Sequence, residues 1–295
     1  MVVPTVLHHI ILLPCFEFNR VLDGFGIMKA KTRKEDEAMN QAEKRRYLID
    51  ALLSEQQRYR RMDIPSDETE QRQLLRGLMN IRLPGAIGED FLAVQDAYLR
   101  EETRRKGVTR FGELEPIEPG LYLWQGDITT LACDAIVNAA NSGMTGCYQP
   151  CHNCIDNCIH TYAGVQLRNA CAALMELQGH EELTGQAKIT PAFNLPCRYV
   201  IHTVGPIVQG RLTRRHEEQL ASCYRACLRL AEENGCRSIA LCCISTGVFG
   251  FPKPRAAEIA VETVRAYRAE AHSEMQVIFA VHNAADHALY RKLLG

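Results

Sequence analysis

Two cysteines and one histidine fall within eight residues of the chain, in the pattern Cys147-x4-His152-x-Cys154. Two thiolates and one imidazole suit Zn²⁺, and three protein ligands leave one coordination position for water or substrate. Asp156 follows in the first turn of an expected helix, where its carboxylate would position a water or interact with the helix dipole. Two alternatives stay open: ordinary reduced cysteines, or a closed structural site completed by Cys151 or Cys158.

A second motif, Ser245-Thr-Gly-Val-Phe-Gly250, directly follows an apolar strand expected at residues 239–244. Its glycines allow a sharp turn that exposes backbone amides, as in loops that cradle a pyrophosphate, although a plain strand-to-helix turn explains the same residues. Asp127 would accept a hydrogen bond from an exocyclic amine such as that of adenine, or cap a turn. Asn138 and Asn141 pose the same question, because asparagine commonly forms turns.

The elements that position these residues alternate between short β-rich runs and helical patterns. The expected strands cover 121–124, 135–138, 187–190, 199–204, 238–243 and 275–281, and the expected helices cover 155–177, 215–234, 255–270 and 284–294. Such alternation predicts an α/β sandwich, in which a mostly parallel sheet carries helices on both faces. Ligands of such sheets bind where strands end and the next helices begin, which is where the cysteine and histidine ligands fall.

The first part of the chain has a different pattern. Residues 28–115 predict a helical region, with helices in 35–62, after the break at 63–66, and from Phe91 to Gly107. Because this region contains no cluster of ligand residues, we expect a packing cap without chemistry of its own. Residues 1–27 are expected to be an upstream extension, since Met28 opens a Lys/Arg-rich segment typical of a chain start. Residues 116–295 form the expected second domain.

The composition limits which kinds of partner and which cellular compartment are expected. The chain has 295 residues, is 46% hydrophobic and carries a net charge of −1. It can bury a large core, and its charge favours neither nucleic acid nor an anionic membrane as a partner. Thirteen cysteines without a secretory segment favour a reducing, cytoplasmic location. The apolar amino-terminal run is too short to span a bilayer.

Five motifs together resemble the macrodomain family in order and spacing. They are GDIT at 126–129, NAAN at 138–141, CIDNCIH at 154–160, VIHTVGP at 200–206 and ISTGVFGFP at 244–252. Macrodomains of the MacroD type have a glycine-rich stretch after NAAN. Here the Cys/His loop replaces it, which resembles the zinc-dependent macrodomains of microbes, and the helical segment with LLRGLMNIRLP and QDAYL resembles their amino-terminal extension. The resemblance implies a three-layer α/β/α sandwich with a mixed, mostly parallel sheet, preceded by that extension.

The resemblance also implies roles for the motif residues in binding ADP-ribose. Asp127 would hold the adenine amino group, with the backbone amide of Ile128 beside it, and Asn141 would contact the distal ribose, which Ile155 and Asp156 would face. The residues around the diphosphate and distal ribose would be Ser245, Thr246, Gly247, Val248, Phe249 and Gly250. One zinc ion on Cys147, His152 and Cys154 would sit beside the scissile ester at the anomeric carbon.

The implied activity is zinc-dependent removal of mono-ADP-ribose from acidic side chains of proteins, with Asn141 and Asp156 as the catalytic pair. A sirtuin-type ADP-ribosyltransferase is the expected partner enzyme. The alternatives are a reader with a structural zinc and no turnover, which would not need a positioned Asp156, and a hydrolase of free acetylated ADP-ribose. Zinc would either activate a water or orient a ribose hydroxyl or the leaving carboxylate. We favour orientation, because thiolate ligands make zinc a poorer Lewis acid.

Overall fold

The computed structural model describes residues 39–295, and the expectations for residues 1–38 lie outside them. Its centre is a seven-stranded sheet with the strand order β2-β3-β9-β8-β5-β7-β6. The strands from β3 to β7 in that order are parallel, and the edge strands β2 and β6 are antiparallel to their neighbours. The strands are β2 (Pro116–Glu118), β3 (Leu121–Gln125), β5 (Ala135–Ala140), β6 (Ala187–Pro191), β7 (Tyr199–Val204), β8 (Ser238–Leu241) and β9 (Gln276–Val281), with a separate parallel pair β1 (Thr109–Arg110) and β4 (Leu131–Ala132).

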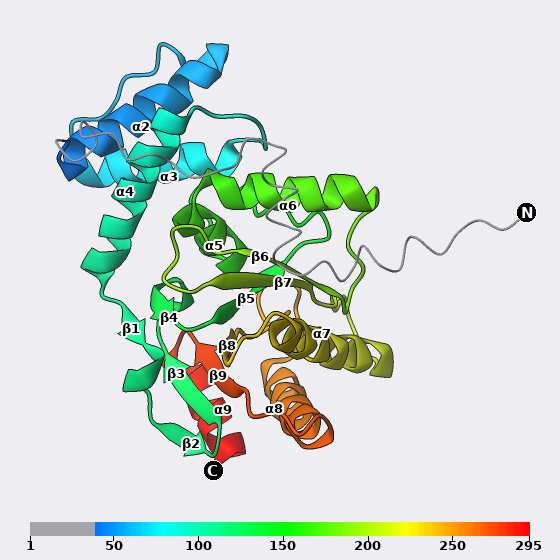
Figure 1. Cartoon of the computed structure of the whole chain (residues 1–295). Coiled ribbons are helices and arrows are strands. Elements are labelled where there is room, and N and C mark those ends of the chain that lie inside the picture. The colour runs from blue at the N-terminus through cyan, green and yellow to red at the C-terminus, as the bar shows by residue number, and fades with distance from the viewer. Residues whose placement is uncertain (1–38) are drawn as a thin grey trace, which may run out of the picture.

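Helices cover both sides of this sheet (Figure 1). They are α5 (Ile155–Ala163), α6 (Val165–Gln178), α7 (Arg214–Glu233), α8 (Lys253–Glu270) and α9 (Ala284–Leu294), and a 3-10 turn, η4 (Ile128–Thr130), follows β3. The central strands read as continuous apolar runs because helices bury both of their faces. Ala135, Ile136 and Val137 of β5, for example, have no exposed surface. The α/β sandwich with a mixed, mostly parallel sheet is therefore confirmed.

One expected helix is divided in two. A single helix over 155–177 is wrong, because the chain breaks at Gly164, which has a φ of +95°. A Cβ atom on Gly164 would lie 2.6 Å from Nε2 of Gln95, a residue of the preceding helical region. The Gln95 side chain also accepts a hydrogen bond from the amide of Val165 (3.0 Å) and so caps the start of α6. A residue 69 positions before the break thus packs against Gly164 and caps the helix that restarts after it.

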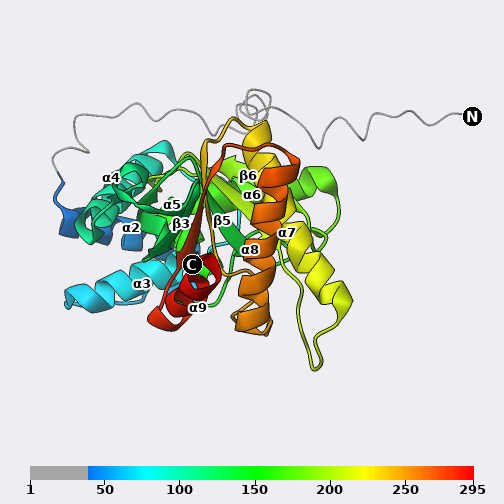
Figure 2. The same ribbon diagram turned by 90° about the horizontal axis from the view of Figure 1, so that it is seen from below.

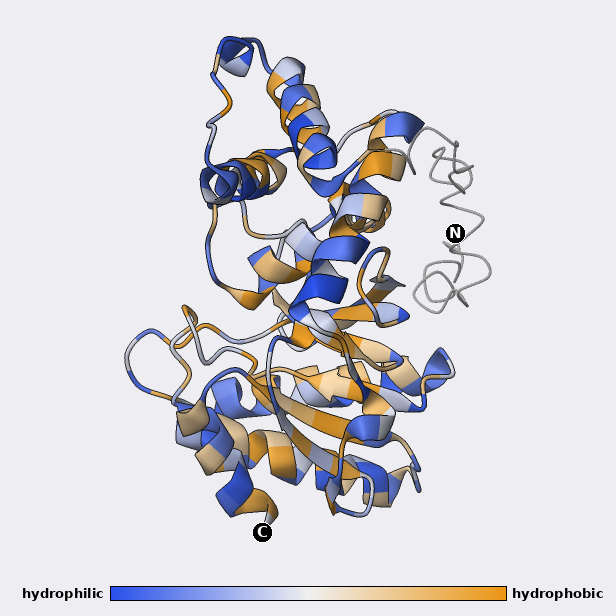
Figure 3. Ribbon diagram, turned by 90° about the vertical axis from the view of Figure 1, so that its left-hand side faces the viewer, coloured by the Kyte–Doolittle hydropathy of each residue, from blue (hydrophilic) through white to orange (hydrophobic). Residues whose placement is uncertain are grey.

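The helical region consists of α2 (Gln41–Glu55), α3 (Glu68–Ile81) and α4 (Glu89–Lys106), joined to the 3-10 turns η2 (Gln57–Tyr59) and η3 (Phe111–Glu113). Side-chain oxygens of Asn40 and Asp67 cap α2 and α3, which explains where these helices begin. Their apolar faces form a separate core, to which Val165 of α6 is added. Figure 3 shows this region as mixed hydrophilic and hydrophobic ribbon above the largely hydrophobic strands.

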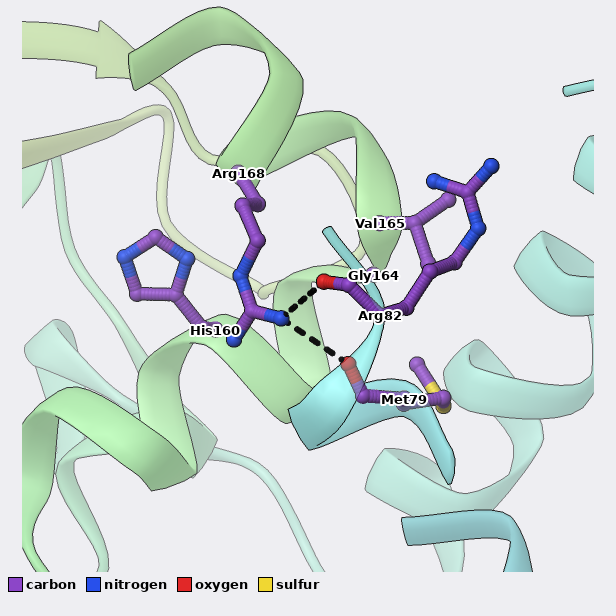
Figure 4. Close-up of a pocket in the computed structure, with 6 residues that line it drawn as sticks. All are labelled: Met79, Arg82, His160, Gly164, Val165 and Arg168. Carbon is purple, nitrogen blue, oxygen red and sulfur yellow. Dashed lines mark hydrogen bonds between the residues drawn. The ribbon is translucent and has the colours of Figure 1, made fainter. Parts of the chain in front are cut away.

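The helical region packs against α5 and α6 rather than against α7 and α8 (Figure 2). The contact is largely polar. Arg168 of α6 is buried, and its Nη1 donates to the carbonyls of Met79 (3.1 Å) and Asn80 (2.7 Å) in the last turn of α3 and of Arg82 (2.5 Å) just after it. The bonds to Met79 and Arg82 are drawn in Figure 4. Beside this guanidinium lies a cavity of about 10 Å³, room for one water, next to His160. Of the helices in residues 39–295, none combines the length and apolar character needed to cross a bilayer.

Candidate active site

The parallel strands bring the predicted site residues to one edge of the sheet. Asp127 follows the end of β3, Asn141 follows β5, and the segment 245–250 follows β8. Since these three strands run in the same direction, their carboxyl ends lie at the same edge. The loop that links β5 to α5 carries the cysteine and histidine ligands to that edge.

The ligand atoms of Cys147, His152 and Cys154 lie within 4.8 Å of one another, and the Cys147 Sγ is 3.5 Å from the His152 Nδ1. Cys154 also caps α5, where its Sγ accepts from the amide of Asn157 (3.4 Å). Burial and the neighbouring Cys147 and Asp156 raise the pKa of the Cys154 thiol to about 12. A divalent cation would offset the cost of the buried thiolate, so this donor set fits zinc.

The two other cysteines of the loop point elsewhere, which bears on whether the site is open. The Sγ of Cys151 donates to the carbonyl of Gln73 (3.3 Å), and the Sγ of Cys158 lies 3.6 Å from Nη2 of Arg76. Within the described residues, neither belongs to the ligand group. Three ligands therefore leave room for a fourth, exchangeable one.

Asp156 lies buried beside this group and is held by two amides. Its Oδ1 accepts from Nδ2 of Asn138 (2.8 Å) and its Oδ2 from Nδ2 of Asn141 (3.3 Å). Burial raises the pKa of the carboxyl to about 6, against the opposing effects of Asn138, Arg168 and Asn141. A cation on the adjacent ligands would lower that pKa. A fixed carboxylate next to an open metal position is suited to hold and deprotonate a water.

A buried histidine supports Asn138 from behind. The Nδ1 of His202 lies 3.1 Å from Nδ2 of Asn138 and accepts from it, while its Nε2 donates to the Oγ1 of Thr190 (3.0 Å). Burial lowers the pKa of His202 to about 3, so the ring stays neutral. Asn138 lies within β5, so the turn alternative is wrong for it, and its side chain belongs to a chain of hydrogen bonds that fixes Asp156. His202 is not among the residues predicted from the sequence, where its only signal is its place in the VIHTVGP motif.

Asp127 has two sets of partners in this structure. Its Oδ1 accepts from the amide and the hydroxyl of Thr129 (3.0 and 2.6 Å) and so caps η4. Its Oδ2 accepts from Nζ of Lys106 (3.1 Å), at the end of α4, and this ammonium also lies 3.3 Å from the centre of the Tyr162 ring. Asp127 therefore caps η4 with its Oδ1, as the capping alternative expects, while its Oδ2 pairs with the Lys106 ammonium. Lys106 was missed, because nothing in the sequence links α4 to this edge.

The segment 245–250 folds back on itself. Phe251 N donates to the carbonyl of Ser245, and Gly250 N donates to that of Gly247 (both 3.0 Å), with positive φ angles at Ser245 (+64°) and Gly250 (+70°). The amides of Gly247, Val248 and Phe249 make no hydrogen bond within the described part of the chain, and Val248 is 81% exposed. Free amides in a tight loop form a favourable site for an anion such as a diphosphate.

Asn141, Asp156 and the metal loop are joined directly. Asn141 donates both to Asp156 and to the carbonyl of Gly146 (3.1 Å), just before the ligand Cys147. The remaining predicted contacts, Ile128 and Ile155, lie in η4 and at the first position of α5. The predicted residues therefore share the end of the sheet, and the tightest cluster is the amide, the carboxylate and the three metal-type ligands.

Comparisons with known proteins agree with this arrangement. The macro domain family matches residues 137–260. A protein-ADP-ribose hydrolase of Treponema medium is 58% identical over 261 residues, which are 87% of this chain and 100% of the relative. A protein-ADP-ribose hydrolase of Staphylococcus aureus is 46% identical over 248 residues, 83% of this chain and 93% of the relative. A structure of the Trypanosoma brucei macrodomain in complex with ADP-ribose is 30% identical with a TM-score of 0.58, covering 78% of this chain and 97% of that one. The chain belongs to the macrodomain family.

Proposed function

We propose that this chain is a zinc-dependent hydrolase that releases mono-ADP-ribose from aspartate and glutamate side chains of modified proteins. That it is a hydrolase follows from relatives that are 46 to 58% identical over nearly their whole length and are themselves protein-ADP-ribose hydrolases. The observation that carries the finer proposal is Asp156, which two amides hold beside a three-ligand group with an open position.

We assign ADP-ribose binding to the carboxyl ends of the parallel strands. The Oδ2 of Asp127 accepts the adenine amino group, beside the amide of Ile128, and the free amides of the segment 245–250 hold the diphosphate. Asn141, Ile155 and Asp156 face the distal ribose. The support is that these groups lie at one edge of a sheet whose fold resembles a macrodomain solved with ADP-ribose.

Catalysis is assigned to the amide and carboxylate pair. Asp156 holds the attacking water and takes its proton, and Asn141 holds the ribose in place through the amide that also fixes Asp156. Water adds at the ester, the ester bond breaks, and the products are ADP-ribose and the free carboxylate of the protein. Zinc held by Cys147, His152 and Cys154 would supply an electrophilic contact for a ribose hydroxyl or the leaving carboxylate.

The proposal also covers the domain boundaries, the cellular compartment and the partner proteins. The helical region extends over 28–115 and the catalytic macrodomain with its zinc loop over 116–295. No two cysteines between residues 39 and 295 are joined by a disulfide, which suits a thiolate metal site in a reducing compartment such as the cytoplasm. The ADP-ribosylated protein is the substrate, and the enzyme that modifies it is expected to be a sirtuin-type transferase.

The test compares linkages and variants. The purified chain is incubated with a protein mono-ADP-ribosylated on glutamate, with a serine-linked counterpart and with free acetylated ADP-ribose. We expect rapid release from the glutamate ester, and at least a hundredfold loss in Asp156→Asn, which keeps the shape of the side chain but not its basicity. Binding of ADP-ribose without release from any substrate would make the chain a reader. Faster cleavage of the free acetylated sugar would identify the third alternative.

A further inference from the structure

We propose that Arg76 of α3 is a positioning residue for the metal centre, so that the helical region is a working part of the active site. The inference rests on the proposed zinc site. It replaces the expectation that residues 28–115 act only as a packing cap. Its basis is a set of hydrogen bonds that run from one face of α3 into the loop between β5 and α5.

The metal loop has little regular structure of its own. Between Asn141 and Cys154 the chain forms neither a helix nor a strand. Three residues there have positive φ angles, Met144 (+60°), Gly146 (+87°) and Cys151 (+55°), of which two are not glycine. Such a conformation persists only when the surroundings hold it. The position of His152, which follows Cys151 directly, therefore depends on contacts from outside the loop.

Arg76 supplies such contacts to both halves of the loop. Its Nη2 donates to the carbonyl of His152 (2.7 Å) and to the Oδ1 of Asn157 (3.1 Å). The Nδ2 of Asn157 in turn donates to the carbonyls of Cys147 (3.3 Å) and Gln149 (2.9 Å). One guanidinium thus connects the backbone of two of the three ligands, directly at His152 and through Asn157 at Cys147.

Asn80, on the same face of α3, holds the loop at Cys151, between Gln149 and His152. The Oδ1 of Asn80 accepts from the amide of Cys151 (2.9 Å), and its Nδ2 donates to the Oγ1 of Thr161 in α5 (2.8 Å). Between Arg76 and Asn80 lies Gly77, where an added Cβ atom would be 3.8 Å from the Cβ atom of Pro150. The loop therefore lies close to this face of the helix, where a methyl group at Gly77 would just reach contact distance, and the Cys151 Sγ donates to the carbonyl of Gln73 (3.3 Å).

Arg76 differs from its neighbour one turn earlier. Arg72 forms ion pairs with Glu68 and Glu102, both inside the helical region. Arg76 forms no ion pair with a carboxylate in residues 39–295, and its Nη2 donates instead to the loop carbonyl of His152 and to the side-chain amide of Asn157 at the start of α5. The Arg76 guanidinium therefore positions the metal loop, whereas the Arg72 guanidinium connects only residues of the helical region. Arg72 is therefore a matched control on the same helix.

The expected effect is on metal retention. Residues that hold metal ligands from behind typically change metal affinity about 10- to 100-fold when they are replaced. We expect Arg76→Gln to speed zinc release by about that factor, Arg76→Lys to restore part of it through one hydrogen bond, and Arg72→Gln to leave it within about twofold. ADP-ribose affinity should change little in all three, because neither Arg76 nor Arg72 is hydrogen-bonded to a residue assigned to ADP-ribose binding.

The experiment loads the full chain with zinc and follows its transfer to a chromophoric chelator in wild type, Arg76→Gln, Arg76→Lys and Arg72→Gln. Hydrogen exchange of residues 142–154 in metal-free protein gives a second readout, which should rise most in Arg76→Gln, less in Arg76→Lys, and stay at the wild-type level in Arg72→Gln. Equal zinc release and equal exchange in Arg76→Gln and Arg72→Gln would overturn the inference. Wild-type protein that binds no zinc would overturn the proposed metal centre itself. Faster exchange in Arg76→Gln would then still show that Arg76 orders the loop.

Discussion

His202 makes the stability of the protein dependent on pH in a way that can be calculated. The ring is fully buried, and its Nδ1 accepts a hydrogen bond from Asn138, so protonation would place two donors against each other. Its pKa falls from the ordinary value of 6.5 to about 3. Between these values the unfolded chain binds the proton and the folded chain does not. Stability from His202 is therefore complete above about pH 6.5 and is lost as the pH falls toward 3.

The loss of unfolding free energy can be calculated from the lowered pKa of His202. Lowering the pH from about 7.5 to about 5 protonates the unfolded ring alone and costs about 2 kcal/mol of unfolding free energy. Burial also lowers the pKa of His160, which adds to the loss. Asp156, with its pKa raised to about 6, acts in the opposite direction and offsets about 1 kcal/mol. Comparison with a variant that lacks only the His202 titration removes these other contributions.

The assay is guanidinium unfolding of metal-free wild type and His202→Gln at the two pH values. Glutamine can accept from Asn138 and donate to Thr190 but does not titrate. Wild type should lose about 2 kcal/mol more than the variant on acidification. The metal-free state is used because acid also displaces metal from its ligands. If both proteins lose the same free energy, the ring is not neutral and buried as described, and the account of how Asp156 is fixed fails with it.

Three further changes test other parts of the structure. Cys154→Ala should abolish zinc retention and turnover together, measured as metal content and ADP-ribose release, because it removes both a ligand and the cap of α5. Arg168→Met should lower the unfolding free energy by about 3 kcal/mol or more, measured by chemical denaturation, because the carbonyls at the end of α3 lose their donor. Asp127→Ala should weaken ADP-ribose binding about tenfold by calorimetry, the effect of losing one charged hydrogen bond.

Each of these changes has an outcome that contradicts it. A folded Cys154→Ala protein that works at the original rate refutes the zinc mechanism in both of its versions. An Arg168→Met protein as stable as wild type would mean that the carbonyls of α3 find other donors. Unchanged affinity in Asp127→Ala would show that this carboxylate only caps η4.

The parallel sheet and its helices were predictable, because apolar runs and helical spacing report burial directly. Tyr199–Val204 and Ala284–Leu294 fall on the expected residues. The break at Gly164 was missed, since the Gln95 side chain that packs against this glycine and caps α6 comes from a distant helix. Local periodicity cannot show a constraint that comes from another part of the chain.

The sequence predicted the ligand residues of the site, but not the residues that hold them in place. The ligand spacing brings Cys147, His152 and Cys154 together as expected. Arg76 and Lys106 were missed, because a solvated helix face and a face that contacts a functional loop have the same composition in sequence. His202 was missed for a related reason, since a buried histidine gives no sequence signal of which amide it holds.

The most direct test of the central claim measures zinc content and ADP-ribose release on the same sample. Purified protein is assayed on a glutamate-linked substrate as isolated, after chelation, and after zinc is restored. We expect about one zinc per chain, loss of ADP-ribose release after chelation, and recovery of release when zinc returns. Full activity in protein shown to be free of metal would rule out zinc-dependent hydrolysis, even if the macrodomain still bound ADP-ribose.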